Sequence, residues 1–164
     1  KQDKKGGRYG LPDCASTCNL LVSKTILQRV GAAGPVFSHA FCNSGSEDKD
    51  FFIRALKMGA SLASAEKSII HRIHGPERYT AQGLIRRGFK NGCSQVNMAR
   101  YHGDGTRRLK LLSTALAKML ISLIVLPFSI FSKGTFMHSL YRVAKAAGVL
   151  YTTLTGRSIK YYSR

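Results

Sequence analysis

Apolar and polar positions alternate in short groups over the first hundred residues, which predicts a mixture of short strands and helices. Strands are expected where a few apolar residues stand between polar or small ones, at 19–22, 60–64 and 67–73. Helices are expected where apolar residues recur with helical spacing, at 24–30, 46–58 and 80–101. Ser23 caps the first helix and Gly31 ends it, whereas Ser46 or its neighbour caps the second helix and Gly59 ends it.

The last sixty residues are apolar and basic, and they contain the longest apolar run of the chain. Residues 111–132 are long enough to cross a bilayer, although Lys118 interrupts the run and Pro127 would kink a helix. A second apolar patch, at 146–154, is a candidate for the second helix of a membrane-associated pair. We therefore expect membrane contact. A single span, a re-entrant pair, an interfacial pair and a buried helix of a soluble domain all remain open.

The net charge of the chain narrows the classes of partner that it could bind. The 164 residues carry 26 Lys and Arg against 8 Asp and Glu, a formal net charge of +18, and no acidic residue follows Asp104. This balance indicates an anionic partner, which is a membrane surface, a phosphorylated substrate or nucleic acid. Nucleic acid is disfavoured, because aromatic residues are not interleaved with basic ones and no finger or RNP-like motif is present. The four cysteines lack C-x-x-C spacing and predict reduced, structural thiols.

The start of the second predicted helix carries the candidate chemistry. Glu47 and Asp48 open this helix behind the small residues Ser44, Gly45 and Ser46. A small-residue loop lets a substrate approach closely, and a carboxylate there suits a general base. The same pattern also fits a plain helix N-terminus on which acidic residues offset the macrodipole. The residue pattern leaves both interpretations open.

Three segments together resemble family 2 glycosyltransferases of the GT-A fold. Glu47-Asp48-x-Asp50-Phe51, followed by Arg54 and Gly59, is similar to the family's G-E-D-x-D-F…R…G motif. The segment 17–27 is similar to the preceding T-G-N-x-x-x-R…L strand and helix, and 76–92 resembles the later P-x-R-x-T…L-x-R-R-x-F-R-x-G helix. Ser46 and Cys18 stand where the family usually has glycine. The order and the intervals also fit, and the resemblance covers residues 14–101.

The resemblance implies an α/β fold class, with a partial GT-A fold of edge strands and helices followed by a mostly helical, membrane-associated tail. Residues 1–15 are then a loop or truncated end. Residues 16–104 are the C-terminal half of a GT-A domain, and residues 105–164 are basic, apolar, membrane-docking helices. The expected location is the cytoplasmic face of the inner membrane.

The resemblance also assigns roles to individual residues. Asp48 matches the catalytic base, which removes the proton of the acceptor hydroxyl so that it attacks the anomeric carbon with inversion. Glu47 would orient this base or bind the acceptor. Arg78, Arg86 and Arg87 match basic positions near the donor diphosphate, although a solvated or lipid-facing basic helix fits them as well. The implied partners are a nucleotide-diphosphate sugar and a saccharide or lipid-linked acceptor, in polysaccharide or glycoconjugate synthesis.

A divalent metal, Mg²⁺ or Mn²⁺, is implied too, bound mainly through an Asp-x-Asp motif that does not occur ahead of Asp48. His71 is a candidate third ligand. On a strand, His71 and His74 would point to opposite faces, so a surface histidine is the other interpretation. We therefore expect an enzyme fragment that is inactive without a nucleotide-binding N-terminal half. The alternative is a basic membrane-surface or nucleic-acid-binding module without catalysis.

Overall fold

The computed structural model describes residues 19–41, 45–63, 67–71, 73–103 and 105–157. Helices make up 75% of these residues. In chain order they are α1 (Lys24–Ala32), η3 (His39–Phe41), α2 (Glu47–Lys57), η4 (Pro76–Tyr79), α3 (Ala81–Tyr101), α4 (Gly105–Phe128), η5 (Ser129–Phe131) and α5 (Lys133–Thr155), where η marks a short 3-10 helix. The chain divides into two compact units, residues 1–73 and 74–164, and each is described by itself.

The predicted α/β fold class, and with it the edge strands of a GT-A fold, is wrong. The described part of the chain is all-α and contains no strand or sheet. Residues 19–22 and 67–71 do lie together, but through the side chain of Asn19, which exchanges hydrogen bonds with the carbonyl and hydroxyl of Ser68 at 3.0 and 3.1 Å. A strand requires a backbone ladder with a neighbour, and an apolar pattern cannot show whether one is present.

The first unit is built from α1 and α2 around an aromatic core. Ser23 caps α1, because its hydroxyl accepts a hydrogen bond from the backbone N–H of Ile26 at 3.3 Å. The helix passes Gly31, where its end was predicted, and stops at Ala32. The buried apolar side chains of this unit are Val30, Phe41, Phe51, Phe52, Ile53 and Ala55. Most of them lie on α2, so the packing of α2 fixes the orientation of its first turn.

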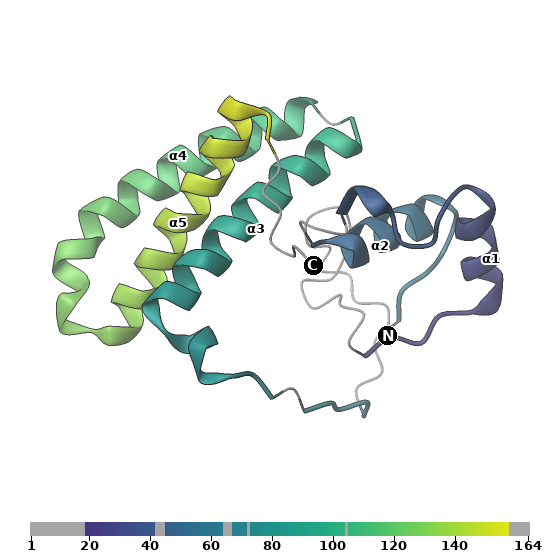
Figure 1. Cartoon of the computed structure of the whole chain (residues 1–164), viewed down its shortest axis with the longest axis horizontal. Coiled ribbons are helices and arrows are strands. Elements are labelled where there is room, and N and C mark those ends of the chain that lie inside the picture. The colour runs from purple at the N-terminus through teal and green to yellow at the C-terminus, as the bar shows by residue number, and fades with distance from the viewer. Residues whose placement is uncertain (1–18, 42–44, 64–66, 72, 104, 158–164) are drawn as a thin grey trace. The chain divides into compact units, whose positions relative to one another are not determined.

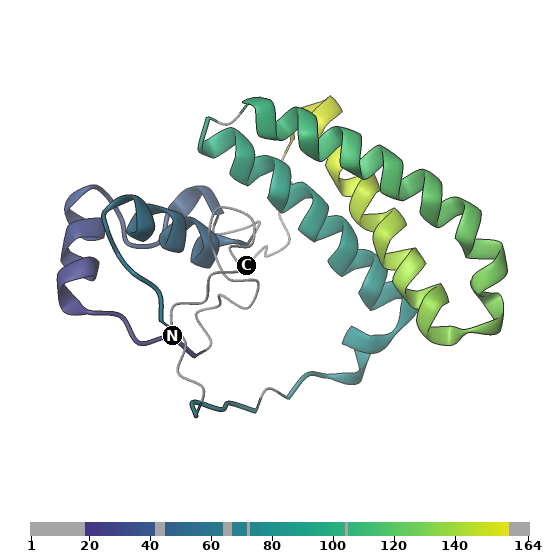
Figure 2. The same cartoon turned by 180° about the vertical axis from the view of Figure 1, so that it is seen from behind.

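The second unit is a bundle of the three long helices, in which α4 and α5 form an antiparallel hairpin around η5 and α3 lies against α5 (Figures 1 and 2). Small residues allow α3 and α5 to approach closely. A Cβ added at Gly92 would meet the carbonyl of Lys145 and would lie 2.8 Å from the backbone nitrogen of Val149. A core of Val96, Ala115, Ala146 and Val149 joins the three helices.

Arg100 joins the C-terminal ends of α3 and α5. Its guanidinium donates hydrogen bonds to the carbonyls of Thr152 at 2.7 Å, Gly156 at 3.0 Å and Thr153 at 3.3 Å. The last carbonyls of a helix have no intrahelical partner and carry the negative end of its macrodipole, so a cation is favourable there. Arg100 therefore stabilises the end of α5 from a neighbouring helix.

The apolar run of the tail lies almost wholly in α4. Over Arg108–Phe128 this helix is long and apolar enough to cross a membrane by length and composition, and only 17% of that window is buried within the structure. Pro127 lies in the last turn of α4, where the chain passes into η5 and turns towards α5. The proline therefore marks the end of the helix rather than a kink in its middle.

Candidate functional site

The chain enters α2 through two residues in the left-handed backbone region. Gly45 has φ +75°, and Ser46 has φ +83° and ψ +15°. Ser46 is the only non-glycine residue with positive φ in the described part of the chain, a conformation that costs L-residues energy. It occupies the N-cap position, as predicted, but its side chain does not cap the helix. The backbone of the acidic motif is thus set by a glycine-like turn.

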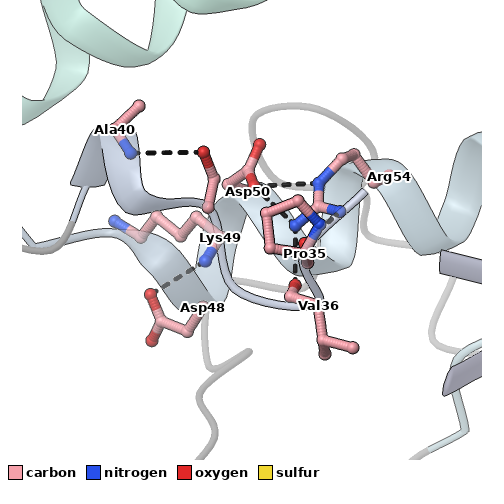
Figure 3. A network of polar contacts seen from close by, with 8 residues as sticks. Pro35, Val36, Ala40, Asp48, Lys49, Asp50 and Arg54 are labelled. Carbon is pink, nitrogen blue, oxygen red and sulfur yellow. Dashed lines mark hydrogen bonds and ion pairs between the residues drawn. The ribbon is translucent and has the colours of Figure 1, made fainter. Parts of the chain in front are cut away.

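Asp50 and Arg54 form a buried ion pair that anchors α2 (Figure 3). The Nε of Arg54 donates to Oδ2 of Asp50 at 2.9 Å, and the Asp50 side chain has no exposed surface. Two further nitrogens of Arg54 donate to the carbonyls of Pro35 at 3.0 Å and Val36 at 2.6 Å. The pair therefore connects the second turn of α2 to the loop that follows α1. Its role is structural, and sequence reasoning had placed both residues only as parts of a motif.

Asp48 lies on a different side of the same helix. At about 100° per residue, Asp48 is turned about 160° from Asp50, so the burial of Asp50 directs Asp48 away from the core. Asp48 is half-buried, and its Oδ1 accepts a hydrogen bond from the backbone N–H of Lys49 at 2.8 Å (Figure 3). Glu47 is exposed. Both carboxylates lie in the first turn, where the macrodipole and the unbonded N–H groups favour negative charge.

The three candidate arginines all belong to the second unit. Arg78 lies half-buried on η4, Arg86 is exposed on α3, and Arg87 is half-buried beside it. The guanidinium carbon of Arg87 lies 5.7 Å from the ring centre of Tyr141 on α5. A cation over an aromatic ring at this distance is weakly attracted, so Arg87 also contributes to the packing of α3 on α5.

Thr80 joins η4 to α3, a feature that the sequence analysis did not identify. Its hydroxyl donates to the carbonyl of Glu77 at 2.8 Å and accepts from the backbone N–H of Gly83 at 3.0 Å. One side chain thus closes the 3-10 turn and caps the long helix. Helix capping by Thr80 is therefore a sufficient structural explanation for the threonine of the motif over 76–92. A threonine four residues after Pro76, just before a helical pattern, was the available signal.

His71 lies exposed in a non-helical segment. Because this segment is not a strand, the argument that placed His71 and His74 on opposite faces does not apply. Within the described residues, no three His, Cys, Asp or Glu side chains lie close enough to hold a metal ion. These residues therefore do not make a metal site by themselves, and a role for His71 as a ligand stays a prediction.

Cys93 is a free, buried thiol on α3. Its Sγ donates to the carbonyl of Gly148 on α5 at 3.5 Å. Burial raises the pKa of the Cys93 thiol above its ordinary value, and a hydrogen bond with the side chain of Thr152 offsets part of this effect. Cys93 is thus an inert packing residue, in line with a structural thiol. The other three cysteines lie outside the described residues.

Compared with family models, with curated proteins and with solved structures, the chain shows no match. The resemblance to family 2 glycosyltransferases therefore rests on the three sequence segments that carry it.

Proposed function

We propose that this chain is the acceptor-side part of an inverting family 2 glycosyltransferase in which Asp48 is the general base. In this reaction the Asp48 carboxylate takes the proton from an acceptor hydroxyl. The hydroxyl oxygen then attacks the anomeric carbon of the donor sugar, and the bond from that carbon to the nucleoside diphosphate breaks. The product has the inverted configuration, and the nucleoside diphosphate leaves with the electron pair.

The observation that carries the proposal is the division of roles among the acidic residues at the start of α2. Asp50 is buried and paired with Arg54, so its carboxylate has a structural role. Asp48 is half-buried on another side of the same helix, and its Oδ1 accepts a hydrogen bond from the backbone N–H of Lys49. A plain acidic helix N-terminus does not require one carboxylate to be buried and ion-paired. A catalytic base does require a rigid support of this kind.

The conformation of Ser46 supports the same interpretation. The resemblance places glycine at this position, and the observed φ of +83° is one that glycine adopts without cost. The left-handed turn thus gives a physical reason for glycine at this position of the family's motif. The backbone of Ser46 therefore follows the path into the acidic motif that a glycine at this position would allow.

Donor binding would involve groups beyond those described. Arg78, Arg86 and Arg87 are the proposed contacts to the donor diphosphate, because a guanidinium can bind two phosphate oxygens at once. No Asp-x-Asp precedes Asp48, so we propose that the nucleotide and a Mg²⁺ or Mn²⁺ ion are held mainly by residues outside this sequence. The acceptor is a saccharide or a lipid-linked saccharide, and the reaction takes place at the cytoplasmic face of the cell membrane.

The test is donor consumption by membranes from cells that express the full-length gene product. Radiolabelled UDP-, GDP- and dTDP-sugars are supplied one at a time, and released nucleoside diphosphate is measured. A donor that the wild-type membranes consume is then offered to the Asp48→Asn variant. We expect turnover to fall by about 100-fold or more, the usual contribution of a general base.

Two matched variants make this result specific. Lys49→Gln changes the neighbouring exposed residue and should leave turnover close to wild type, whereas Glu47→Gln should cause a smaller loss than Asp48→Asn. Wild-type turnover in a folded Asp48→Asn protein would remove Asp48 as the base. The second candidate, a membrane-surface module without catalysis, is favoured by the exposed apolar side of α4 and predicts that no donor is consumed at all.

A further inference from the structure

Helix α4 has two sides of different character. One side packs into the second unit through Leu111, Ala115 and Ser122, with Met119 against the shared core. The other side leaves large apolar residues uncovered, with exposed fractions of 69% for Leu109, 58% for Leu120, 67% for Ile124 and 76% for Phe128. Leu116, Ile121 and Leu123 are also exposed, as is Phe131 in η5. Such a contiguous apolar surface is typical of an interaction site.

The one charge inside the apolar run lies away from this surface. At about 100° per residue, Lys118 is turned about 160° from Leu120 and lies within about 20° of the direction of buried Leu111. Lys118 is itself exposed, beside the packed side of α4. Lys118 therefore lies outside the apolar surface, although it interrupts the apolar run in the sequence.

Basic residues surround this surface and acidic residues are scarce. Fifteen of the 26 Lys and Arg residues, but only Glu77 and Asp104 among the acidic ones, fall within residues 74–164. Arg108 and Lys110 are exposed in the first turns of α4, and Lys133 is exposed just after the exposed Phe131. An apolar surface with cations at both ends is complementary to lipid acyl chains under anionic headgroups.

We propose that the second unit docks on an anionic phospholipid bilayer with α4 lying flat in the interface. In this arrangement Leu109, Leu120 and Phe128 enter the acyl boundary together, and the basic residues reach lipid phosphates. Lys118 points away from the hydrocarbon. The inference rests on the membrane association proposed above, and it is independent of the role of Asp48.

A span of the bilayer by α4 fits the structure less well. Lys118 is ten residues from each end of the window Arg108–Phe128, so a span would carry it to the middle of the hydrocarbon. Helix α4 also packs along α5, which runs antiparallel to it after η5 (Figures 1 and 2). Arg142 on α5 is exposed and lies as far from the hairpin turn as Lys118 does, so a span would bury this charge as well.

Vesicle binding tests the choice of partner. The 164-residue chain is mixed with vesicles of phosphatidylcholine alone, or of phosphatidylcholine with an equal part of phosphatidylglycerol, and bound protein is measured by flotation. We expect binding to the anionic vesicles to be about tenfold tighter or more, and to weaken with salt. Equal binding to both vesicles, or no binding to either, would overturn the proposal.

A pair of charge-matched variants tests the surface. Leu120→Glu with Ile124→Glu places two charges on the apolar side of α4, and Gln82→Glu with Ile85→Glu places two at exposed positions of α3. We expect the α4 pair to lower anionic-vesicle binding by about tenfold or more, and the α3 pair by less than about threefold. Equal losses would mean that net charge, not the α4 surface, governs binding. Far-UV circular dichroism confirms that both proteins keep their helices.

Depth measurements distinguish flat docking from a span. The chain contains no tryptophan, so single changes Leu109→Trp, Leu120→Trp and Phe128→Trp each introduce one fluorophore. Leu109 and Leu120 are about 16 Å apart along the helix, about half the thickness of the hydrocarbon core. With lipids brominated at shallow or deep chain positions, flat docking gives three similar, shallow quenching profiles. A deep profile at Leu120 with shallow profiles at both ends would overturn it.

These measurements need neither a donor nor an acceptor. Loss of transfer in Asp48→Asn with unchanged vesicle binding leaves the docking proposal intact, and failed docking leaves the test of Asp48 untouched.

Discussion

The carboxylate of Asp50 and the guanidinium of Arg54 form an ion pair of 2.9 Å between successive turns of α2. Because Arg54 also donates to the carbonyls of Pro35 and Val36, the pair holds α2 against the preceding loop. It also separates two carboxylates that look equivalent in the sequence. Asp50 faces the core, and Asp48 is left at the accessible side of the first turn.

Arg54→Met should destabilise the first unit. The change leaves the Asp50 carboxylate buried without its cation, which costs about 3 kcal/mol or more, because a buried charge without its counter-ion is strongly unfavourable. Hydrogen exchange of backbone amides, read by mass spectrometry, should show faster exchange in α2 and unchanged exchange in α3. The exposed Lys57→Met on the same helix is the control. Unaltered α2 exchange in Arg54→Met would show that the pair does not hold the helix.

Ser46→Gly should stabilise the same unit. At φ +83° a serine bears left-handed strain of about 1–2 kcal/mol, and glycine relieves it but loses about 0.5–1 kcal/mol of backbone entropy, so a net gain of about 0.5–1 kcal/mol is expected. Slower amide exchange at the start of α2 would report this gain. Ser61→Gly, at an exposed non-helical position without positive φ, should be neutral or slightly destabilising. If both changes destabilise equally, the left-handed turn is not a source of strain.

Two glycine-to-alanine changes should act in opposite directions on the second unit. A Cβ at Gly92 collides with the backbone of α5, so Gly92→Ala should destabilise by about 1–3 kcal/mol through forced separation of α3 and α5. Gly134, in the first turn of α5, has nothing within 4 Å of its added Cβ. Gly134→Ala should therefore stabilise by about 0.5–1 kcal/mol through helix propensity. Thermal unfolding followed by circular dichroism measures both, and a stabilising Gly92→Ala would contradict the close packing of α3 and α5.

Cys93 should resist alkylation and should make stability fall at alkaline pH. Burial raises the pKa of its thiol in the folded chain, so above the ordinary thiol pKa the unfolded state loses its proton first. The free energy of unfolding therefore falls as the pH rises from the ordinary thiol pKa towards the raised pKa of Cys93 in the folded chain. In a chain with Cys14, Cys18 and Cys42 changed to serine, iodoacetamide should label Cys93 at pH 8 much more slowly than it labels the denatured chain. Equal rates would place the thiol in contact with solvent.

The helices were predictable, because their start signals are local. Ser23 and Ser46 occupy the N-cap positions that the pattern indicated, and the end of α3 at Tyr101 agrees with the predicted range. The strands were wrong, because a short apolar group carries no information about a backbone partner. Leu21 and Ile73, expected inside a sheet, are 98% and 97% exposed.

The start of α2 was predictable from the sequence, but the geometry of its carboxylates was not. A run of acidic residues after small ones indicated the start of α2, and the residues of that motif lie there. Which carboxylate is buried depends on Arg54 reaching Pro35 and Val36, nineteen and eighteen residues earlier in the chain. Such non-local contacts leave no periodic signal in the sequence. The left-handed backbone at Ser46 could not be predicted either, because a positive φ is common for glycine and uncommon for serine.

In the proposed reaction, Asp48 acts in the chemical step and not in donor binding. The most direct test compares kcat and donor affinity of the full-length wild-type and Asp48→Asn proteins, with a donor that the wild type consumes. We expect kcat to fall by about 100-fold or more while the Kd of the donor changes by less than about threefold, because a base acts only on the reacting acceptor. An unchanged kcat, or a loss that lies wholly in donor affinity, would contradict it.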